Sequence, residues 1–451
     1  MKQQVNTRSV ILDILLEINE KDKFTHPILL EALKKYQYLS KEDRAFISHV
    51  VRGTVERKIT LDYITDKFSS QPVKKMKPAI RNILRMSVYQ LIYMDGVKDY
   101  AVCDEAVKLT VKRGYKFFKN FVNAVLRNIA VNKSDIKMPD RNANLLEYFS
   151  ITYSTPEWLA AKWLNDYGEE AAETMLRAQF EKRPLTIRCN TSRITPAELA
   201  KRLRIEGITV NDELMIPEAL EISDYDYLEK IPEFEEGLFF VQDISSMLVC
   251  HVAAPLDNSY VIDLCAAPGG KSMHMAEMLK DTGYVEARDI SEAKVEKIRD
   301  NIERLNLENV AAIAMDARFT DELSIGKADV VIADLPCSGL GVIGRKPDIK
   351  YHASPNACAE LIQLQREILK ASADYVKTGG ILVYSTCTVN KDENIENVRW
   401  FTDNFPFKLD SIDEYIPKQL CSETTKEGYI QLLPGVNGNN DGFFIARLIR
   451  R

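Results

Sequence analysis

Apolar residues recur with a helical period over the first 132 residues of the chain. Stretches such as VILDILLEI, AFISHVVRGTV and IRNILRMSVYQLIY place apolar residues three and four positions apart, which is the spacing of one face of an α-helix. None of these stretches alternates with the period of two that a half-buried strand requires. Residues 1–132 are therefore predicted to form an all-helical domain.

The next part of the chain mixes strand-like and helical stretches. After the polar stretch VNKSDIKMPDRNAN, which we interpret as a linker, LTIRCN alternates as a strand does. TPAELAKRLRIEG then has the capping threonine, first-turn proline and final glycine of a short helix, and ITV returns to extended structure. These elements predict a small α+β domain over residues 145–235, serving as a linker and in RNA recognition.

From Tyr260 onward, strands and helices are expected to alternate. The predicted strands are YVIDLCA, YVEARD, VAAIAMD, DVVIADL, ILVYSTC and FFIARLI, and helical periodicity separates most of them. This order is typical of a doubly wound α/β fold with a mostly parallel sheet, whose ligands bind at the carboxyl ends of the strands. We predict a Rossmann-like domain over residues 236–451, in a chain that is multidomain as a whole.

Charge is divided unevenly between these parts. The net charge of −6 combines +10 over residues 1–150, from 27 Lys and Arg against 17 Asp and Glu, with −16 over the remainder, from 33 against 49. A basic module joined to an acidic one suggests that the first meets a polyanion. Its basic stretches KKMKPAIRNILR (74–85) and VKRGYKFFKN (111–120) are the candidates for phosphate contacts, although solvated helix faces would look the same.

Composition places the protein in a broad class. No eighteen apolar residues run together, so no membrane span is predicted. The eight cysteines show no CxxC spacing, so neither a metal site nor a redox motif is expected. We expect a cytoplasmic protein with reduced thiols and no membrane partner.

A turn of small residues follows the first predicted strand of the Rossmann-like domain, in DLCAAPGGKS. It is not a phosphate-binding loop, because Cys265 stands where that motif requires glycine. Small residues, and Gly269 and Gly270 in particular, still let a ligand approach the backbone closely. The sequence therefore favours a ligand site without a phosphate cradle.

Three further strands of this domain end in acids, namely Asp289, Asp316 and Asp334. An acid after the second strand suits a ribose hydroxyl pair, and one after the third suits an adenine amino group. Any one of them alone would equally suit a helix N-cap. Together they predict an adenosine ligand without phosphate, and S-adenosylmethionine fits that description.

Two cysteines stand just beyond predicted strands, Cys337 in PCSG and Cys387 in STC. Methylation of carbon 5 of cytosine needs a thiolate that adds to carbon 6, whereas methylation of an amino group does not. Asp334 could stabilise the base during that attack, either as a carboxylate or with a proton and a raised pKa. The remaining cysteines are interpreted as small buried hydrophobes: Cys103, Cys189, Cys250, Cys358 and Cys421.

DLCAAPGGKS, DLPCSGLGVIGRKPDIK, YSTCT and DGFFIARL resemble the motifs of the cytosine-5 RNA methyltransferases, in particular the bacterial enzymes of small-subunit ribosomal RNA. The first 130 residues resemble the helical RNA-binding fold of the NusB family. The resemblance implies that Cys387 attacks carbon 6 and that Cys337 assists release. It also implies that the cofactor and cytosine site is lined by Cys265, Ala266, Ala267, Pro268, Gly269, Gly270, Lys271, Asp289, Asp316 and Asp334.

The resemblance also implies partners. The expected substrate is 16S ribosomal RNA or an early small-subunit assembly intermediate, and the enzyme is expected to be a monomer. Transfer RNA as substrate, or a non-catalytic RNA-binding factor, are the alternatives. Asp243 is a further site candidate. Arg288 departs from the apolar pattern of its strand and is expected at the strand's exposed end.

Overall fold

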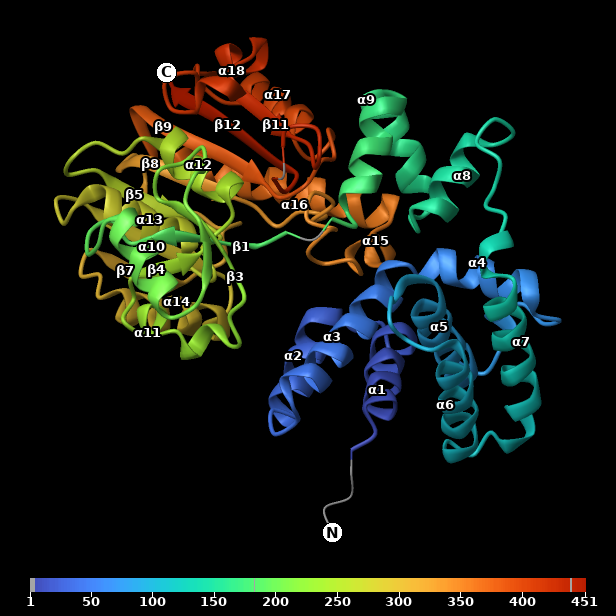
Figure 1. Ribbon diagram of the computed structural model, residues 1–451. Coiled ribbons are helices and arrows are strands. Elements are labelled where there is room, and N and C mark those ends of the chain that lie inside the picture. Colours follow the sequence, from blue (N-terminus) through green and yellow to red (C-terminus); the bar gives the residue numbers. More distant parts are fainter. Residues whose placement is uncertain (1–4, 182, 439) are drawn as a thin grey trace. The chain divides into compact units, whose positions relative to one another are not determined.

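The computed structural model describes residues 5–181, 183–438 and 440–451, which form two compact units. Unit 1 comprises Met1–Phe180 with the segment Ile343–His352, and unit 2 comprises Glu181–Val342 with Ala353–Arg451. Residues 1–4 of the predicted helical domain lie outside the described residues. Figure 1 labels the elements of both units.

The regular elements in the described part of unit 1 are helices, and over residues 5–132 this confirms the prediction from the apolar periodicity. They are α1 (Thr7–Glu20), α2 (Thr25–Lys35), α3 (Lys41–Glu56), α4 (Lys58–Phe68), α5 (Pro78–Tyr93), α6 (Asp99–Lys112), α7 (Lys119–Val131), α8 (Leu145–Thr152), α9 (Glu157–Ala178) and α15 (Ile349–His352), with 3₁₀ turns at Val73–Lys75, Lys116–Phe118 and Lys133–Asp135. Polar side chains cap several of them: Asn6 and Ser40, for example, accept from backbone N–H groups in the first turns of α1 and α3.

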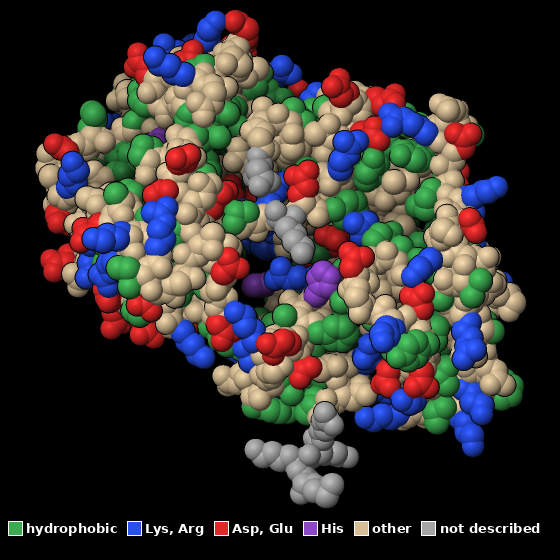
Figure 2. Space-filling model, in the orientation of Figure 1, with side chains coloured by type: hydrophobic (Ala, Val, Ile, Leu, Met, Phe, Trp, Pro, Cys, Tyr) green, Lys and Arg blue, Asp and Glu red, His purple; other side chains and the backbone are tan. Residues whose placement is uncertain are grey.

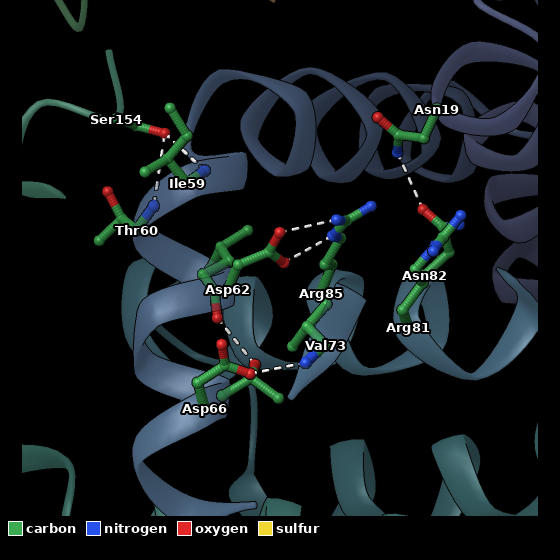
Figure 3. Close-up of polar contacts among 12 residues, drawn as sticks. Asn19, Ile59, Thr60, Asp62, Asp66, Val73, Arg81, Asn82, Arg85 and Ser154 are labelled. Atoms are coloured by element: carbon green, nitrogen blue, oxygen red, sulfur yellow. Dashed lines mark hydrogen bonds and ion pairs between the residues drawn. The ribbon is translucent and has the colours of Figure 1, made fainter. Parts of the chain in front are cut away.

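Helix α5 is the centre of unit 1, because apolar residues on most of its faces are buried against the surrounding helices. Its arginines are engaged as well (Figure 3): Arg85 Nε and Nη2 each donate to the Asp62 carboxylate at 2.7 Å. Arg81 pairs with Glu20 in the same way. Both arginines lie in the stretch 74–85 that was expected to contact phosphates. Only the exposed lysines of that stretch therefore remain candidates for phosphate contacts.

Unit 2 contains a small antiparallel sheet in the order β2-β3-β1-β4. Its elements are β1 (Leu185–Cys189), α10 (Pro196–Ile205), β2 (Thr209–Asn211), β3 (Ala219–Ser223), α11 (Pro232–Glu235) and β4 (Phe239–Val241). The strand, helix and strand predicted for this stretch are confirmed, and the helix begins at a Thr195 cap. Apolar residues of the sheet and α10 form a core of their own.

The second sheet of unit 2 has eight strands, in the order β10-β12-β9-β8-β5-β6-β7 with β11 paired to β12. The strands are β5 (Tyr260–Asp263), β6 (Tyr284–Asp289), β7 (Val310–Ala314), β8 (Ala328–Asp334), β9 (Val376–Thr386), β10 (Phe407–Leu409), β11 (Tyr429–Leu432) and β12 (Phe443–Arg450). Strands β5 to β9 are parallel, and β12 runs antiparallel to β9. The predicted, mostly parallel sheet is confirmed, with two short strands, β10 and β11, that the sequence pattern missed.

Helices cover both faces of this sheet. They are α12 (Ile244–Ala253), α13 (Gly270–Leu279), α14 (Glu292–Leu305), α16 (Pro355–Tyr375), α17 (Ile395–Asn404) and α18 (Glu423–Glu427). Along β8, Val330 and Ile332 pack into the core that includes α12 to α14, while Val331 and Ala333 pack into the core that includes α16 and α17. The alternation of one strand between two apolar cores is what a doubly wound fold requires.

Two expectations about single residues were wrong. Arg288 is buried within β6, where its guanidinium binds Glu286 and donates to Ser324 Oγ at 2.7 Å, so the charge is satisfied inside the fold and not at an exposed strand end. Cys421 is exposed, because it follows a 3₁₀ turn at the surface, whereas the other four cysteines interpreted as packing residues are buried. No helix among the described residues combines the length and apolar character that a bilayer span needs.

Candidate active site

A pocket of ≈ 210 Å³ lies at the carboxyl end of β5. Seven of the residues that the sequence predicts for the cofactor line it: Cys265, Ala266, Ala267, Pro268, Gly270, Lys271 and Asp334. Gly269 precedes α13 as its N-cap with φ of 105°, a backbone conformation that favours glycine. A β-carbon at residue 270 would lie 3.1 Å from the Phe240 ring, so glycine there keeps this side of the pocket open.

Asp263 lines the same pocket, although the sequence argument did not single it out. Its Oδ2 accepts from Ser272 Oγ at 2.6 Å, whereas its buried Oδ1 has no hydrogen-bond partner among the described residues. Burial raises the pKa of Asp263 to about 7, against the lowering effects of Ser272 and Lys271. A ligand cation would satisfy this carboxylate, and S-adenosylmethionine carries two cationic groups. The sequence signal that could have identified Asp263 is its position as the acid at the end of β5.

The small sheet supplies another wall of the pocket. Phe240 of β4 and Gln242, which follows it, both line the cavity. Asp243 lines it too, and its side chain caps α12 by accepting from Ser245 N at 3.0 Å. The apolar ring next to a backbone loop of small residues suits a flat heterocycle, so the residues present fit an adenosine ligand.

Asp289 and Asp316 are placed differently from Asp263. Asp289 is buried, and its Oδ2 accepts from Ala267 N at 3.1 Å, which ties the end of β6 to the cofactor loop. Asp316 is paired through both oxygens with Arg318, and this partner lowers its pKa. Neither is among the described residues that line the pocket. Their predicted roles at the ribose and the adenine remain predictions.

An ion pair connects the pocket to the end of β8. Lys271 Nζ donates to Asp334 Oδ2 at 2.6 Å, and Ser385 Oγ donates to Asp334 Oδ1 at 3.0 Å. Burial opposes the charge on Lys271, but the neighbouring Asp334 outweighs it and raises the pKa of Lys271. Lys271 therefore has a contact that accounts for its position at the start of α13.

The two cysteines predicted for catalysis lie together. Cys337 follows β8 and Cys387 follows β9, and these strands are neighbours in the parallel part of the sheet. Their Sγ atoms are 3.3 Å apart. The hydrogen bond to Cys387, together with burial, raises the pKa of Cys337 well above that of a free thiol. The proton is therefore held on Cys337, from which it can be donated to a thiolate on Cys387.

Glu393 holds the turn that carries Cys337, and the sequence argument missed it. Its fully buried carboxylate accepts from Ser338 N at 2.9 Å and Ser338 Oγ at 2.5 Å. Asn390 Nδ2 and Gln365 Nε2 donate to it as well, at 2.9 and 3.0 Å. These hydrogen bonds hold the loop after β9 against the loop after β8.

The glycine of the DGFF stretch completes this contact between loops. Gly341 N donates to Cys387 O at 3.1 Å, and Gly442 N donates to Gly341 O at 2.9 Å. A β-carbon on Gly341 would lie 1.9 Å from Gly442 O, so only glycine permits the approach. The motifs at 337–341, 387 and 441–442 are therefore one packed assembly.

Three family models match the chain. The family described as 16S rRNA methyltransferase RsmB/F matches residues 250–449, the NusB family matches residues 5–131, and the ferredoxin-like domain of RsmF/B-like methyltransferases matches residues 155–225. The predicted fold class, with its NusB-like helical domain, small α+β domain and Rossmann-like domain, is thereby confirmed, and the match describes the small α+β domain as ferredoxin-like.

Individual relatives agree with these families. A protein of Bacillus subtilis named probable ribosomal RNA small subunit methyltransferase B is 35% identical over the full length of both chains. The crystal structure of PH0851 matches with a TM-score of 0.81 and 25% identity over the whole of both chains. A methyltransferase homolog from Pyrococcus horikoshii matches with a TM-score of 0.59 and 27% identity, over 68% of this chain and 99% of its own.

Asp263 is expected to make cofactor binding depend on pH. Because its pKa is about 7 in the free protein, protons compete with a cationic ligand below neutrality, and the affinity for S-adenosylmethionine should rise up to about tenfold per unit between roughly pH 5.5 and 7. Asp263→Asn should bind more weakly and lose this dependence. Calorimetry at several pH values measures both.

Asp289→Ala serves as the matched comparison. If Asp289 accepts from the ribose, as the sequence predicts, its loss should weaken binding roughly tenfold to hundredfold at every pH, since hydrogen bonds to charged groups contribute about 1.5–3 kcal/mol. An unchanged pH profile in Asp263→Asn would place the titrating group elsewhere.

Proposed function

Since the chain belongs to the RsmB/F family of 16S rRNA methyltransferases, we propose that it methylates carbon 5 of a cytosine in 16S ribosomal RNA through a covalent cysteine adduct. Family membership makes the protein an RNA methyltransferase whose methyl donor is S-adenosylmethionine. The carbon atom, the adduct and the RNA substrate are the proposal.

The pair of thiols carries this proposal. An exocyclic amino group has a lone pair and needs no covalent help, whereas carbon 5 becomes nucleophilic only after a thiolate adds to carbon 6. Cys337 and Cys387 lie 3.3 Å apart at the edge where Asp334 joins the cofactor pocket. An amino methyltransferase would have no use for two thiols there.

Each thiol has its own role in the proposed reaction. Cys387 forms the S–C6 bond, and the electron pair of the C5–C6 double bond moves to carbon 5. S-adenosylmethionine supplies the methyl group that carbon 5 takes up. Transfer of the carbon 5 proton to a water molecule then restores the double bond and expels the Cys387 thiolate. Cys337, with its raised pKa, exchanges protons with Cys387 during this release.

Asp334 is proposed to bind the target base. Its carboxylate is paired with Lys271 and would accept a hydrogen bond from the amino group of cytosine. Ser385 and Lys271 fix its two oxygens, so the carboxylate is oriented before the base arrives. Lys271 is thus a positioning residue for Asp334.

The remaining proposals concern organisation and substrate. We propose that the chain is divided into a helical RNA-binding domain at 1–132, a small domain at 145–235 and a methyltransferase domain at 236–451. The substrate is 16S ribosomal RNA, free or in an early small-subunit assembly intermediate, and the enzyme acts as a cytoplasmic monomer. The names of the relatives support the RNA.

Single cysteine variants should give opposite results. Cys387→Ala cannot form the adduct, so methylation should vanish while RNA still binds reversibly. Cys337→Ala leaves attack possible but slows release, so a covalent protein–RNA complex should accumulate and survive a denaturing gel. The double variant should behave like Cys387→Ala. Cys421→Ala, at an exposed cysteine, is the matched control and should methylate normally.

Other gel patterns would contradict these roles. A covalent band from Cys387→Ala but not from Cys337→Ala would exchange the two functions. No band from either variant would make Cys337 a packing residue of the turn. A misfolded variant could mimic inactivity, but it could not produce a band that depends on the other thiol.

Bisulfite sequencing tests the substrate. In cells that lack the protein, one cytosine of 16S ribosomal RNA should become convertible, and the wild-type chain, but not Cys387→Ala, should restore its protection. A change confined to transfer RNA would keep the chemistry and replace the substrate. No changed cytosine in any RNA would contradict carbon 5 methylation.

Exposed lysines of unit 1 are expected to contact RNA phosphates. Lys and Arg side chains lie over the lower ends of α6 and α7 in Figure 2, and Lys112, Lys116 and Lys119 are exposed there. Replacing these three by alanine should weaken RNA binding and reduce the salt dependence, by about 0.7–0.9 in the log–log slope per lost contact.

The control for this experiment removes equal charge from unit 2. It replaces Lys280, Lys327 and Lys408, which are exposed on that unit. Filter binding at several salt concentrations compares the two variants, and unchanged affinity for S-adenosylmethionine shows that both are folded. Equal losses in both would mean that unit 1 has no special role.

A further inference from the structure

Glu218, His251 and His274 converge in unit 2, and none of them has a role in the proposed reaction. His251 Nε2 lies 2.5 Å from Glu218 Oε1, and His274 Nε2 lies 3.4 Å from the same oxygen. One donor atom from each residue lies within 4.8 Å of the others. Glu218 directly precedes β3, and the histidines lie on α12 and α13. The three residues are too far apart in sequence to form a short spacing motif, and the sequence predicted no metal.

His274 is a buried side chain whose Nε2 faces Glu218, while its other ring nitrogen has no partner among the described residues. It is only 4% exposed, and the nitrogen without a partner among them is Nδ1. Imidazole nitrogens are among the commonest metal ligands in proteins.

The nearby cation is already matched. Arg188 is fully buried, pairs with Glu277 and donates to Gln242 Oε1 at 2.7 Å. Its charge therefore compensates Glu277, and Glu218 is left facing two imidazoles. A divalent cation bound between them would neutralise Glu218 without leaving a buried charge unpaired.

We infer that Glu218, His251 and His274 form a Zn²⁺ site with one position open to water. Two imidazole nitrogens and one carboxylate oxygen are a donor set typical of zinc with an open fourth position. Bonds of about 2.0–2.2 Å in a tetrahedron place donor atoms roughly 3.3 Å apart, which the separation between Glu218 and His274 already matches. His251 has to withdraw from Glu218 by less than about 1 Å, as the present separation of 2.5 Å requires, and its side chain is 31% exposed.

The donor set also selects against the commoner cations. Mg²⁺ and Ca²⁺ prefer oxygen ligands, and here two of the three donors are nitrogens. Glu218 is hydrogen-bonded through its backbone to Cys189 of β1, so zinc would join the small sheet to α12 and α13. Helix α13 begins with Gly270 and Lys271 at the cofactor pocket, one turn before His274. Zinc is therefore expected to stabilise unit 2 and to strengthen cofactor binding.

The test uses the full chain with Cys337→Ser and Cys387→Ser, because those two thiols are a competing zinc site. After removal of metal with a chelator, zinc titration by calorimetry should give one ion per chain and raise the melting temperature. His251→Gln in this background should weaken zinc binding at least about tenfold, as loss of metal-site partners does. His26→Gln, at an exposed histidine of unit 1, is the matched control and should leave it unchanged.

Two outcomes would overturn the site. One is the absence of stoichiometric zinc binding in the serine background, and the other is wild-type zinc affinity in folded His251→Gln. Co²⁺ gives a measurement that does not depend on histidine variants, since the site should show the d–d absorption of tetrahedral cobalt without thiolate charge transfer. An octahedral spectrum or a thiolate band would likewise reject it.

Discussion

The buried carboxylate of Glu393 is the contact on which the catalytic edge depends. A carboxylate without solvent is costly unless hydrogen bonds satisfy it, and here both oxygens receive donors from Ser338, Asn390 and Gln365. These bonds fix the loop after β8 against the loop after β9. This packing holds Cys337 and Cys387 with their Sγ atoms 3.3 Å apart.

The order of strands explains why residues far apart in sequence lie at one edge of the sheet. Strands β5, β8 and β9 are neighbours, so the acid at the end of β5, Asp334 at the end of β8 and Cys387 after β9 reach one edge of the sheet. The ion pair between Lys271 and Asp334 joins the cofactor loop to the thiols across this edge. A methyl donor and a target base bound on either side of Asp334 would therefore meet without any rearrangement of the strands.

The small sheet contributes more than a connection between domains. Phe240 and Gln242 line the pocket, and the fully buried pair of Arg188 and Glu277 joins β1 to α13. Removing either partner of such a pair would leave an uncompensated charge, which typically costs about 3–5 kcal/mol. The small sheet and the Rossmann-like sheet therefore form one cooperative unit, and the cofactor pocket depends on both.

The sequence by itself determined the helical and alternating parts of the fold, because hydrophobic periodicity is a local property that each segment carries. It also determined that the two cysteines and the acids at strand ends lie at one edge of the sheet, because residues that follow parallel strands share that edge in any strand order. Tertiary structure alone decided which acids face the pocket: Asp263 does, whereas Asp289 binds the loop backbone and Asp316 binds Arg318. It likewise placed Arg288 in the interior and Glu393 beneath the turn at Ser338. These contacts join residues tens of positions apart, and their geometry depends on strand order and side-chain packing, which no local pattern encodes.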